Sequence, residues 1–180
     1  MFQGAMISLL WLLLACSAGD CPHVVDHAQP ISATQAIPSD TRITLERTGC
    51  EGACPMYTLK ITADGVVIYY GKQFIRRRGK VVSKISQEQL RQLISDFDKA
   101  NYFSLRERYA HPEDGCAGSG IDYPSAITSM RVNGRSKTIT HDYGCRERPA
   151  DGSVGQVYPK ELYELERRID EITGTKQWIR

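Results

Sequence analysis

Apolar and polar residues alternate in short segments from residue 42 onwards, with the two-residue period of a half-buried β-strand. In the first half, Asp64-Gly65 lies between two such segments and supplies the positive φ angles that a tight hairpin turn needs. Gly71-Lys72 and Gly79-Lys80 bracket further short segments. The strands predicted in this half are residues 42–47, 57–62, 66–70, 74–78 and 81–85.

The same alternation returns in the second half. Residues 126–132 place every second side chain on one face, and residues 136–141 alternate again. Between them, Asn133-Gly134 is the strongest hairpin signal in the chain. A second hairpin is therefore predicted here.

Each half continues into a segment with helical spacing. Ser86 and Gln89 form a capping-box pair before the first segment, which Asn101 ends. In the second, Pro159 suits the first turn and Gly174 the C-cap. The apolar faces are Leu90, Leu93, Ile94 and Phe97 in one helix and Leu162, Leu165, Ile169 and Ile172 in the other. The expected class is α+β, an antiparallel sheet of hairpins with two helices packed on one face and Trp178 sealing the seam.

The first residues predict an export signal. Residues 1–16 carry no charged side chain, and residues 7–15 form a nearly unbroken apolar run too short to span a bilayer. Leu13-Leu14-Ala15-Cys16 then has the form of a lipobox, so residues 1–15 are predicted to be a signal peptide and Cys16 the lipidated N-terminus. A start at Met6, or a buried helix in place of the leader, are the alternatives.

The residue after Cys16 indicates in which membrane the lipoprotein is expected to reside. It is Ser17 rather than the Asp that commonly retains lipoproteins in the inner membrane, so an outer-membrane lipoprotein facing the periplasm is favoured over a Gram-positive surface lipoprotein. Residues 16–40 hold Pro and small polar residues without periodicity and predict a flexible tether. Residues 41–180 remain as a single α+β domain.

Charge and cysteine content agree with an envelope protein. The 23 basic and 21 acidic residues give a net charge of +2, which favours no nucleic acid or other polyanion as partner. Six cysteines suit an oxidising compartment better than the cytosol.

Several short motifs resemble a bacterial domain family of unknown function that is found mainly in lipoproteins. The most specific is Cys50-x-Gly52-x-Cys54-Pro55-x-Tyr57. The others are Asp64-Gly65, Ile121-Asp122-Tyr123-Pro124, Thr138-Ile139-x-x-Asp142-Tyr143-Gly144, Leu165-Glu166-x-x-Ile169-Asp170 and Trp178. The resemblance covers about three quarters of the chain. It implies a fold and an envelope setting but no activity.

Cys50 and Cys54 have two interpretations. As a disulfide they lock a short arch, which stabilises by about 2 kcal/mol in the chain-entropy model. As a C-x-x-x-C-P loop they are similar to the copper loop of thioredoxin-fold Sco proteins, which suggests redox or copper chemistry. A strand rather than a helix is predicted after Pro55, so the helix dipole that activates such thiols is not expected here, and the disulfide is favoured.

Cys116 and Cys145 are predicted to form a second disulfide, between a Gly-rich loop and the exit of the second hairpin. A zinc site with His111 and His141 is the less favoured alternative, because the spacing matches no standard ligand pattern. Cys21 is then left as a free thiol or an intermolecular bridge.

Two polar segments are candidate binding elements. Arg76, Arg77 and Arg78 form the densest basic cluster and either protect an exposed sheet edge or contact anionic lipid, lipopolysaccharide or an acidic protein. Asp114 and Asp122 lie in a long polar loop and are candidates for cation binding, although no calcium-loop pattern surrounds them.

The sequence favours a non-enzymatic module. Hydrolase elbows, zinc-protease pairs and phosphate-binding glycine loops are absent from it, and we assign no catalytic residue, metal ligand or cofactor. The predicted function is that of a disulfide-stabilised envelope lipoprotein that binds another envelope protein or an anionic component. The alternative is a thiol-redox or copper-handling protein that uses Cys50 and Cys54. An uncharacterised hydrolase is the weakest of the three.

Overall fold

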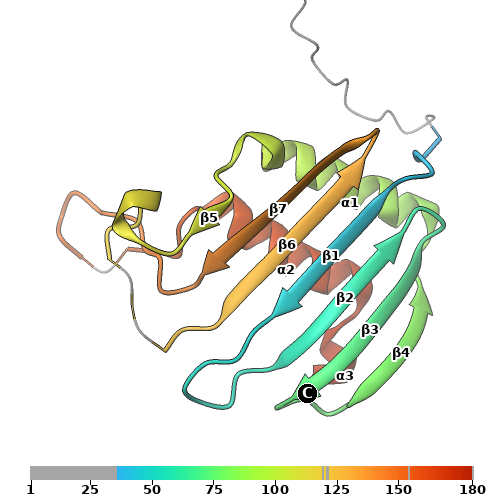
Figure 1. The fold of residues 1–180 in the computed structure, drawn as a ribbon, viewed down its shortest axis with the longest axis horizontal. Coiled ribbons are helices and arrows are strands. Elements are labelled where there is room, and N and C mark those ends of the chain that lie inside the picture. The colour runs from blue at the N-terminus through green and yellow to red at the C-terminus, as the bar shows by residue number, and fades with distance from the viewer. Residues whose placement is uncertain (1–35, 119, 121, 154, 180) are drawn as a thin grey trace, which may run out of the picture.

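The computed structural model describes residues 36–118, 120, 122–153 and 155–179. Seven strands form one sheet in the order β4-β3-β2-β1-β6-β7-β5, shown in Figure 1. All neighbours are antiparallel except β5 and β7. The strands are β1 (Arg42–Arg47), β2 (Met56–Thr62), β3 (Val66–Gln73), β4 (Gly79–Lys84), β5 (Arg108–Tyr109), β6 (Ser125–Val132) and β7 (Arg135–Asp142).

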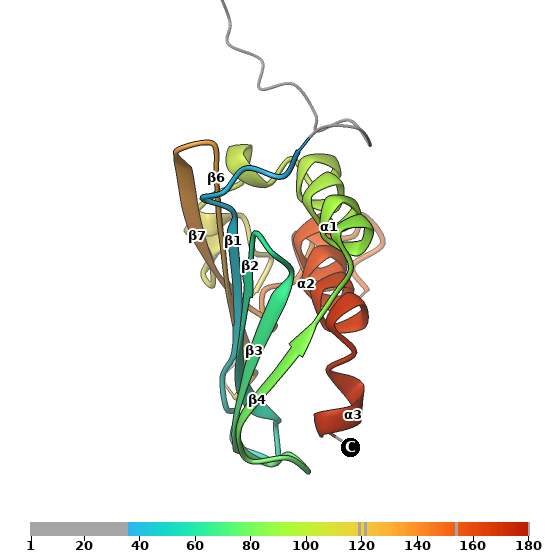
Figure 2. The same ribbon diagram turned by 90° about the vertical axis from the view of Figure 1, so that its right-hand side faces the viewer.

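The helices lie on one face of this sheet, as Figure 2 shows. They are α1 (Gln87–Lys99), α2 (Lys160–Thr173) and the short α3 (Lys176–Ile179), with 3-10 turns at Tyr102–Ser104 and Pro112–Asp114. The α+β class with helices on one face is thus confirmed. None of the helices in the described residues is long and apolar enough to cross a membrane.

Most of the capping and turn signals act where the sequence predicts. Ser86 and Gln89 form the capping box of α1, and Gly174 ends α2 in the left-handed conformation. Pro159 is the N-cap of α2 rather than part of its first turn. Gly65 has a φ of +81°, and a Cβ there would lie 2.5 Å from the Ile85 carbonyl oxygen, so the first hairpin turn requires glycine.

The core fills the space between the sheet and the helices. Alternate side chains of the central strands point into it, including Ile43, Leu45, Leu59 and Ile139, all nearly inaccessible to water. The predicted apolar faces of α1 and α2 pack against them. Trp178 covers one end, with its ring 4.8 Å from that of Tyr69.

The predicted strand at residues 74–78 is wrong. This segment is a loop between β3 and β4, and β3 instead continues to Gln73. Phe74 takes a φ of 52°, which breaks the extended backbone, and the N–H groups of Arg76 and Arg77 donate to the carbonyl oxygens of Ile179 and Trp178. The loop therefore bonds to the C-terminal helix instead of to a neighbouring strand.

The start of the described chain and two of the loops lie at opposite ends of the sheet. Residue 36 precedes β1, so the described chain enters at the end of the sheet where β1 begins (Figure 1). The loop between β1 and β2 and the loop between β3 and β4 both lie at the opposite end, because these four strands are antiparallel in sequence order. We call this opposite end the far end of the sheet.

Candidate functional site

Both predicted cysteine pairs are disulfides. Cys50 and Cys54, with Cα atoms 5.6 Å apart, lie half-buried in the loop between β1 and β2 at the far end. Cys116 and Cys145, 5.0 Å apart, are buried and join the loop after β5 to the segment after β7. Because these two sulfurs are bonded to each other, they offer no thiolates for the alternative zinc site. Cys16 and Cys21 lie outside the described residues.

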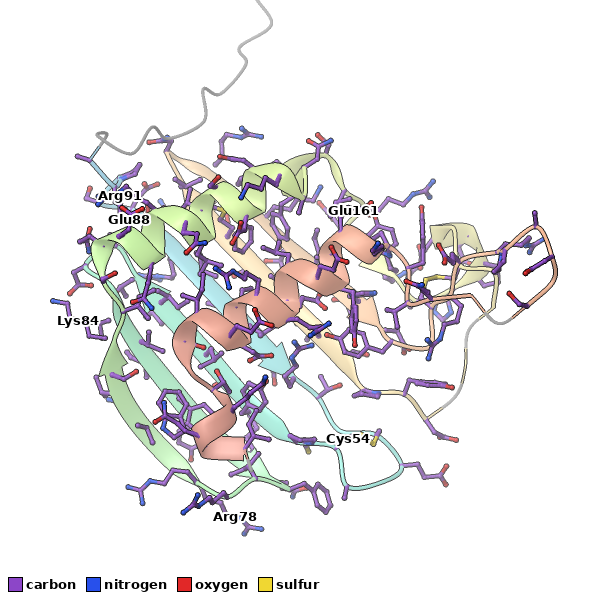
Figure 3. All side chains as sticks on the ribbon, turned by 180° about the vertical axis from the view of Figure 1, so that it is seen from behind. Cys54, Arg78, Lys84, Glu88, Arg91 and Glu161 are labelled. Atoms are coloured by element: carbon purple, nitrogen blue, oxygen red, sulfur yellow. A yellow bond between two sulfur atoms is a disulfide. The ribbon has the colours of Figure 1, made fainter. Side chains whose placement is uncertain are left out.

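The surroundings of Cys54 differ from those of an activated dithiol. Pro55 follows it directly and β2 begins at Met56, so no helix starts at this disulfide (Cys54 is labelled in Figure 3). The N–H of Gly52 points at the Cys50 sulfur from 3.3 Å. The loop is a short covalent arch that leads into a strand.

The three arginines lie in the loop between β3 and β4, which we call the basic loop (residues 74–78). Arg76, Arg77 and Arg78 are all exposed, and within the described residues none of them forms an ion pair. Phe74 is 52% exposed despite its size. Figure 3 shows Arg78 at the tip of the far end.

Asp114 and Asp122 lie in different surroundings. The Asp114 carboxylate accepts hydrogen bonds from Arg108 Nε at 2.9 Å and from the N–H groups of Ala110 and His111 at 3.1 Å. The bond from Arg108 lowers the pKa of Asp114 below its usual value, against the opposing effect of burial. Its oxygens thus order their own loop, whereas Asp122 is exposed with a φ of 78°. Among the described residues, no group of three or more His, Cys, Asp or Glu is placed to hold a metal ion.

The structure also reveals a polar cluster that the sequence analysis missed. It lies between the sheet and α2 and consists of Arg47, Tyr57, Thr128, His141, Tyr143, Glu166 and Asp170; we call it the buried polar cluster. Its first half joins three elements, because Arg47 on β1 and Tyr57 on β2 both donate to the Asp170 carboxylate on α2, at 2.8 and 2.7 Å. Arg47 and Tyr57 face each other across the strand pair.

In this half of the cluster, neighbouring charges and burial shift the pKa values of Arg47 and Tyr57. Burial by itself would lower the pKa of Arg47, but the charges of Asp170 and Glu166 raise it above its usual value. Burial, and then the Asp170 charge, raises the pKa of Tyr57. Arg47 is consequently held as a cation and Tyr57 as a neutral donor.

The second half of the cluster centres on Glu166, whose side chain is inaccessible to water. Its carboxylate accepts from Tyr143 at 2.7 Å and from Thr128 at 3.3 Å, and lies 3.1 Å from His141 Nδ1. His141 Nε2 lies 3.1 Å from the Tyr158 carbonyl oxygen. Both ring nitrogens of His141 thus face an oxygen that can accept a hydrogen bond.

Every charged side chain of the cluster is therefore engaged by another. Glu166 and Asp170 lie four residues apart and so share one face of α2, which is the signal that the sequence contained. The predicted apolar face of α2 left out Glu166, although it is as buried as Leu162. The cluster ties α2 to four strands, and its chemistry is that of a structural interlock rather than of a nucleophile or base facing a substrate.

Two shallow hollows open beside the cluster at the far end. One, of about 180 Å³, is lined by Arg47, Thr48, Cys54, Pro55, Tyr57, Pro124 and Ile179. The other, of about 250 Å³, is lined by Pro55, Arg167, Asp170, Glu171, Lys176 and Ile179. Pro55 and Ile179 line both hollows, and Cys54 lines the first. Both are smaller than the sites that typically enclose a drug-sized ligand.

Comparison with known proteins gives a family and no activity. Residues 41–173 match the family described as Domain of unknown function (DUF6438). No curated protein matches the chain. The match agrees with the expected family of unknown function and covers all of the main sheet, α1 and α2. The chain belongs to the DUF6438 family.

Proposed function

We propose that this protein is a lipid-anchored envelope protein whose disulfide-stabilised domain binds another envelope component, without catalysing a reaction. The observation that carries the proposal is the contrast between two sets of charged residues. Glu166 and His141, which resemble part of a catalytic set, are buried and lie within hydrogen-bond distance of each other, and the partly buried Asp170 accepts from Arg47 and Tyr57. The cations of the basic loop are exposed and available to a partner.

The position of the basic loop supports this assignment. The described chain enters at the end of the sheet where β1 begins, and the basic loop lies at the far end. Phe74 adds an apolar contact there: its positive φ is strained for a residue with a Cβ, and such strain commonly persists at functional sites.

Two measurements test the proposal in cells that export the full chain. Cys16→Ser is expected to move the protein from the membrane fraction to the soluble periplasm, because the acyl chains supply its anchoring. A photo-crosslinking residue in place of Phe74 is expected to give an adduct that disappears when Arg76, Arg77 and Arg78 are changed to Ser. The same crosslinker at Ser136, exposed on β7, is the matched control. Equal labelling at both positions, or no change with Cys16→Ser, would contradict the proposal.

The thiol-redox alternative is tested by a thiol census of the exported protein. Alkylation without reduction, followed by digestion and mass spectrometry, is expected to leave Cys50 and Cys54 protected as a pair, even under mild reductant. Rapid labelling of these two cysteines, or stoichiometric copper after reconstitution, would favour the alternative instead. Both cysteines are half-buried and Cys54 lines a hollow, so an alkylating reagent can reach the pair if it is reduced.

A further inference from the structure

Strand β4 is an exposed edge of the sheet. It pairs with β3 along its six residues, and β4 is the terminal strand in the sheet order. Figures 1 and 3 show none of the described elements beyond it. An edge strand presents a row of backbone N–H and C=O groups that can pair with another extended chain.

Basic residues predominate around this edge, and the acidic Asp64, at its border, lies near Lys84. Between Gly65 and Gln87 the sequence has six basic residues and no acidic one: Lys72, Arg76, Arg77, Arg78, Lys80 and Lys84. Lys72 pairs with Glu46, and the other five form no ion pair among the described residues. The net charge of +2 for the chain conceals this concentration. We call the basic loop together with β4 the basic edge.

The side chains of β4 add a specific pattern. Lys80, Val82 and Lys84 alternate along one face and are exposed, with Val82 59% exposed. Their cross-strand neighbours on β3 are Tyr70, Ile68 and Val66. The edge thus presents an apolar position between two cations, beside an exposed tyrosine.

We propose that β4 binds an acidic, extended segment of a partner protein by strand addition, which deepens the proposed function and rests on it. A strand added beside β4 places its side chains opposite those of β4, within contact distance. The complementary segment has an acidic residue, any residue, an apolar residue, any residue and a second acidic residue. In the antiparallel orientation, further acidic residues after this motif lie beside Arg76, Arg77 and Arg78.

The same lysines select against other occupants. A second copy of β4 would bring like charges together, which disfavours self-pairing while leaving an acidic strand free to bind. A lipid surface would use the charges but not the backbone groups of the edge. Strand addition is the mode that uses both features.

Peptide binding to the exported Cys16→Ser protein tests the proposal by fluorescence anisotropy. The probe is the peptide Glu-Thr-Val-Thr-Glu-Asp-Asp-Asp. The first control peptide has the same composition, but each glutamate is moved by one position and so lies on the opposite face of the added strand. The second control carries N-methyl groups on alternate backbone amides of the probe, which removes strand pairing and keeps the charge. The probe is expected to bind at least about tenfold more tightly than either control.

Matched variants locate the site. Lys80→Glu with Lys84→Glu is expected to weaken binding by at least about tenfold, because cross-strand attraction becomes repulsion at two positions. Lys99→Glu with Lys160→Glu makes the same change of charge at exposed positions on α1 and α2 and is expected to leave binding within about twofold.

Three results would overturn the proposal: equal binding of the N-methylated peptide, equal weakening by both pairs of variants, or self-association abolished by Lys80→Glu with Lys84→Glu. Stronger binding to vesicles of anionic phospholipid than to the probe would also overturn it, in favour of a membrane. If the crosslink at residue 74 is specific and the probe still fails, the proposed function stands and this inference alone falls. If the crosslink is absent, the proposed function falls and this inference falls with it, even if the probe binds.

Discussion

The buried polar cluster and the basic edge use similar residue types in opposite ways. In the cluster, Arg47 lies between the carboxylates of Asp170 and Glu166 and its side chain is 12% exposed. On the basic edge, Arg76, Arg77 and Arg78 face water without a counter-charge among the described residues. Charge that is paired and buried fixes the structure, since removing one member leaves the others unsatisfied. Charge that is exposed and unpaired adds little to stability and remains available for recognition.

The largest expected effect comes from breaking the cluster at its centre. Glu166→Gln removes the charge that engages His141, Tyr143 and Arg47, and is expected to lower the free energy of unfolding by about 3–5 kcal/mol. Urea unfolding followed by far-UV circular dichroism measures it. Glu164→Gln is the matched control: this glutamate lies on the exposed side of α2, 3.7 Å from Lys160, and its loss should cost under about 0.5 kcal/mol. Equal losses would show that the cluster is not a structural interlock.

The two disulfides sharpen the comparison because one is buried and the other is half-buried at the far end of the sheet. Cys116→Ser with Cys145→Ser opens a sequence separation of 29 and is expected to lower the free energy of unfolding by about 3–4 kcal/mol. Cys50→Ser with Cys54→Ser opens a separation of 4 and is expected to cost about 2 kcal/mol. The same urea measurement compares them. A larger loss for the Cys50–Cys54 pair would mean that this arch supports more of the fold than its own loop.

The sequence carried enough information for most of the sheet. Alternation with two strong turn signals, Asp64-Gly65 and Asn133-Gly134, predicted both hairpins, and the capping box at Ser86 predicted the start of α1. These features are local, since each depends on residues within a few positions of one another. The cysteine pairs were also predicted, from their spacing and from the compartment that the leader predicts.

Two features depended on contacts that are distant in sequence. The segment 74–78 alternates like a strand, yet its N–H groups bond to Ile179 and Trp178, about a hundred positions away. The buried polar cluster joins Arg47 to Asp170 across 123 positions. The spacing of Glu166 and Asp170 indicated a shared helix face, but only the fold shows that this face meets an arginine and a histidine rather than water.

Alkaline pH tests the buried polar cluster through Tyr57, because the free energy of unfolding is expected to depend on the protonation of this buried residue. Burial raises its pKa in the folded protein above the unfolded value of 10.0, so the folded state holds the proton more tightly. Its contribution is therefore complete below about pH 10 and is lost as the pH rises beyond that value, by at most about 1.4 kcal/mol per pH unit. Tyr57→Phe is expected to reduce this alkaline slope, measured by urea unfolding at a series of pH values. The matched control is Tyr70→Phe, which removes a hydroxyl from a half-exposed ring. An unchanged slope in Tyr57→Phe would contradict the burial argument.

The smallest expected effect on stability is that of the arginines in the basic loop. Residues that serve binding and not folding should change the free energy of unfolding very little when they are replaced. Changing Arg76, Arg77 and Arg78 together to Ser is expected to alter the free energy of unfolding by under about 0.5 kcal/mol, because the loop bonds to α3 through its backbone N–H groups and not through its guanidinium groups. Gly71→Ala is the contrasting variant. A Cβ at Gly71 would lie 2.2 Å from the Arg77 carbonyl oxygen, so it should displace the loop and lower stability by more than the triple change, although it removes no charge. If the triple arginine variant unfolds more easily than Gly71→Ala, the arginine side chains hold the loop in place, and their exposure would no longer indicate a binding role.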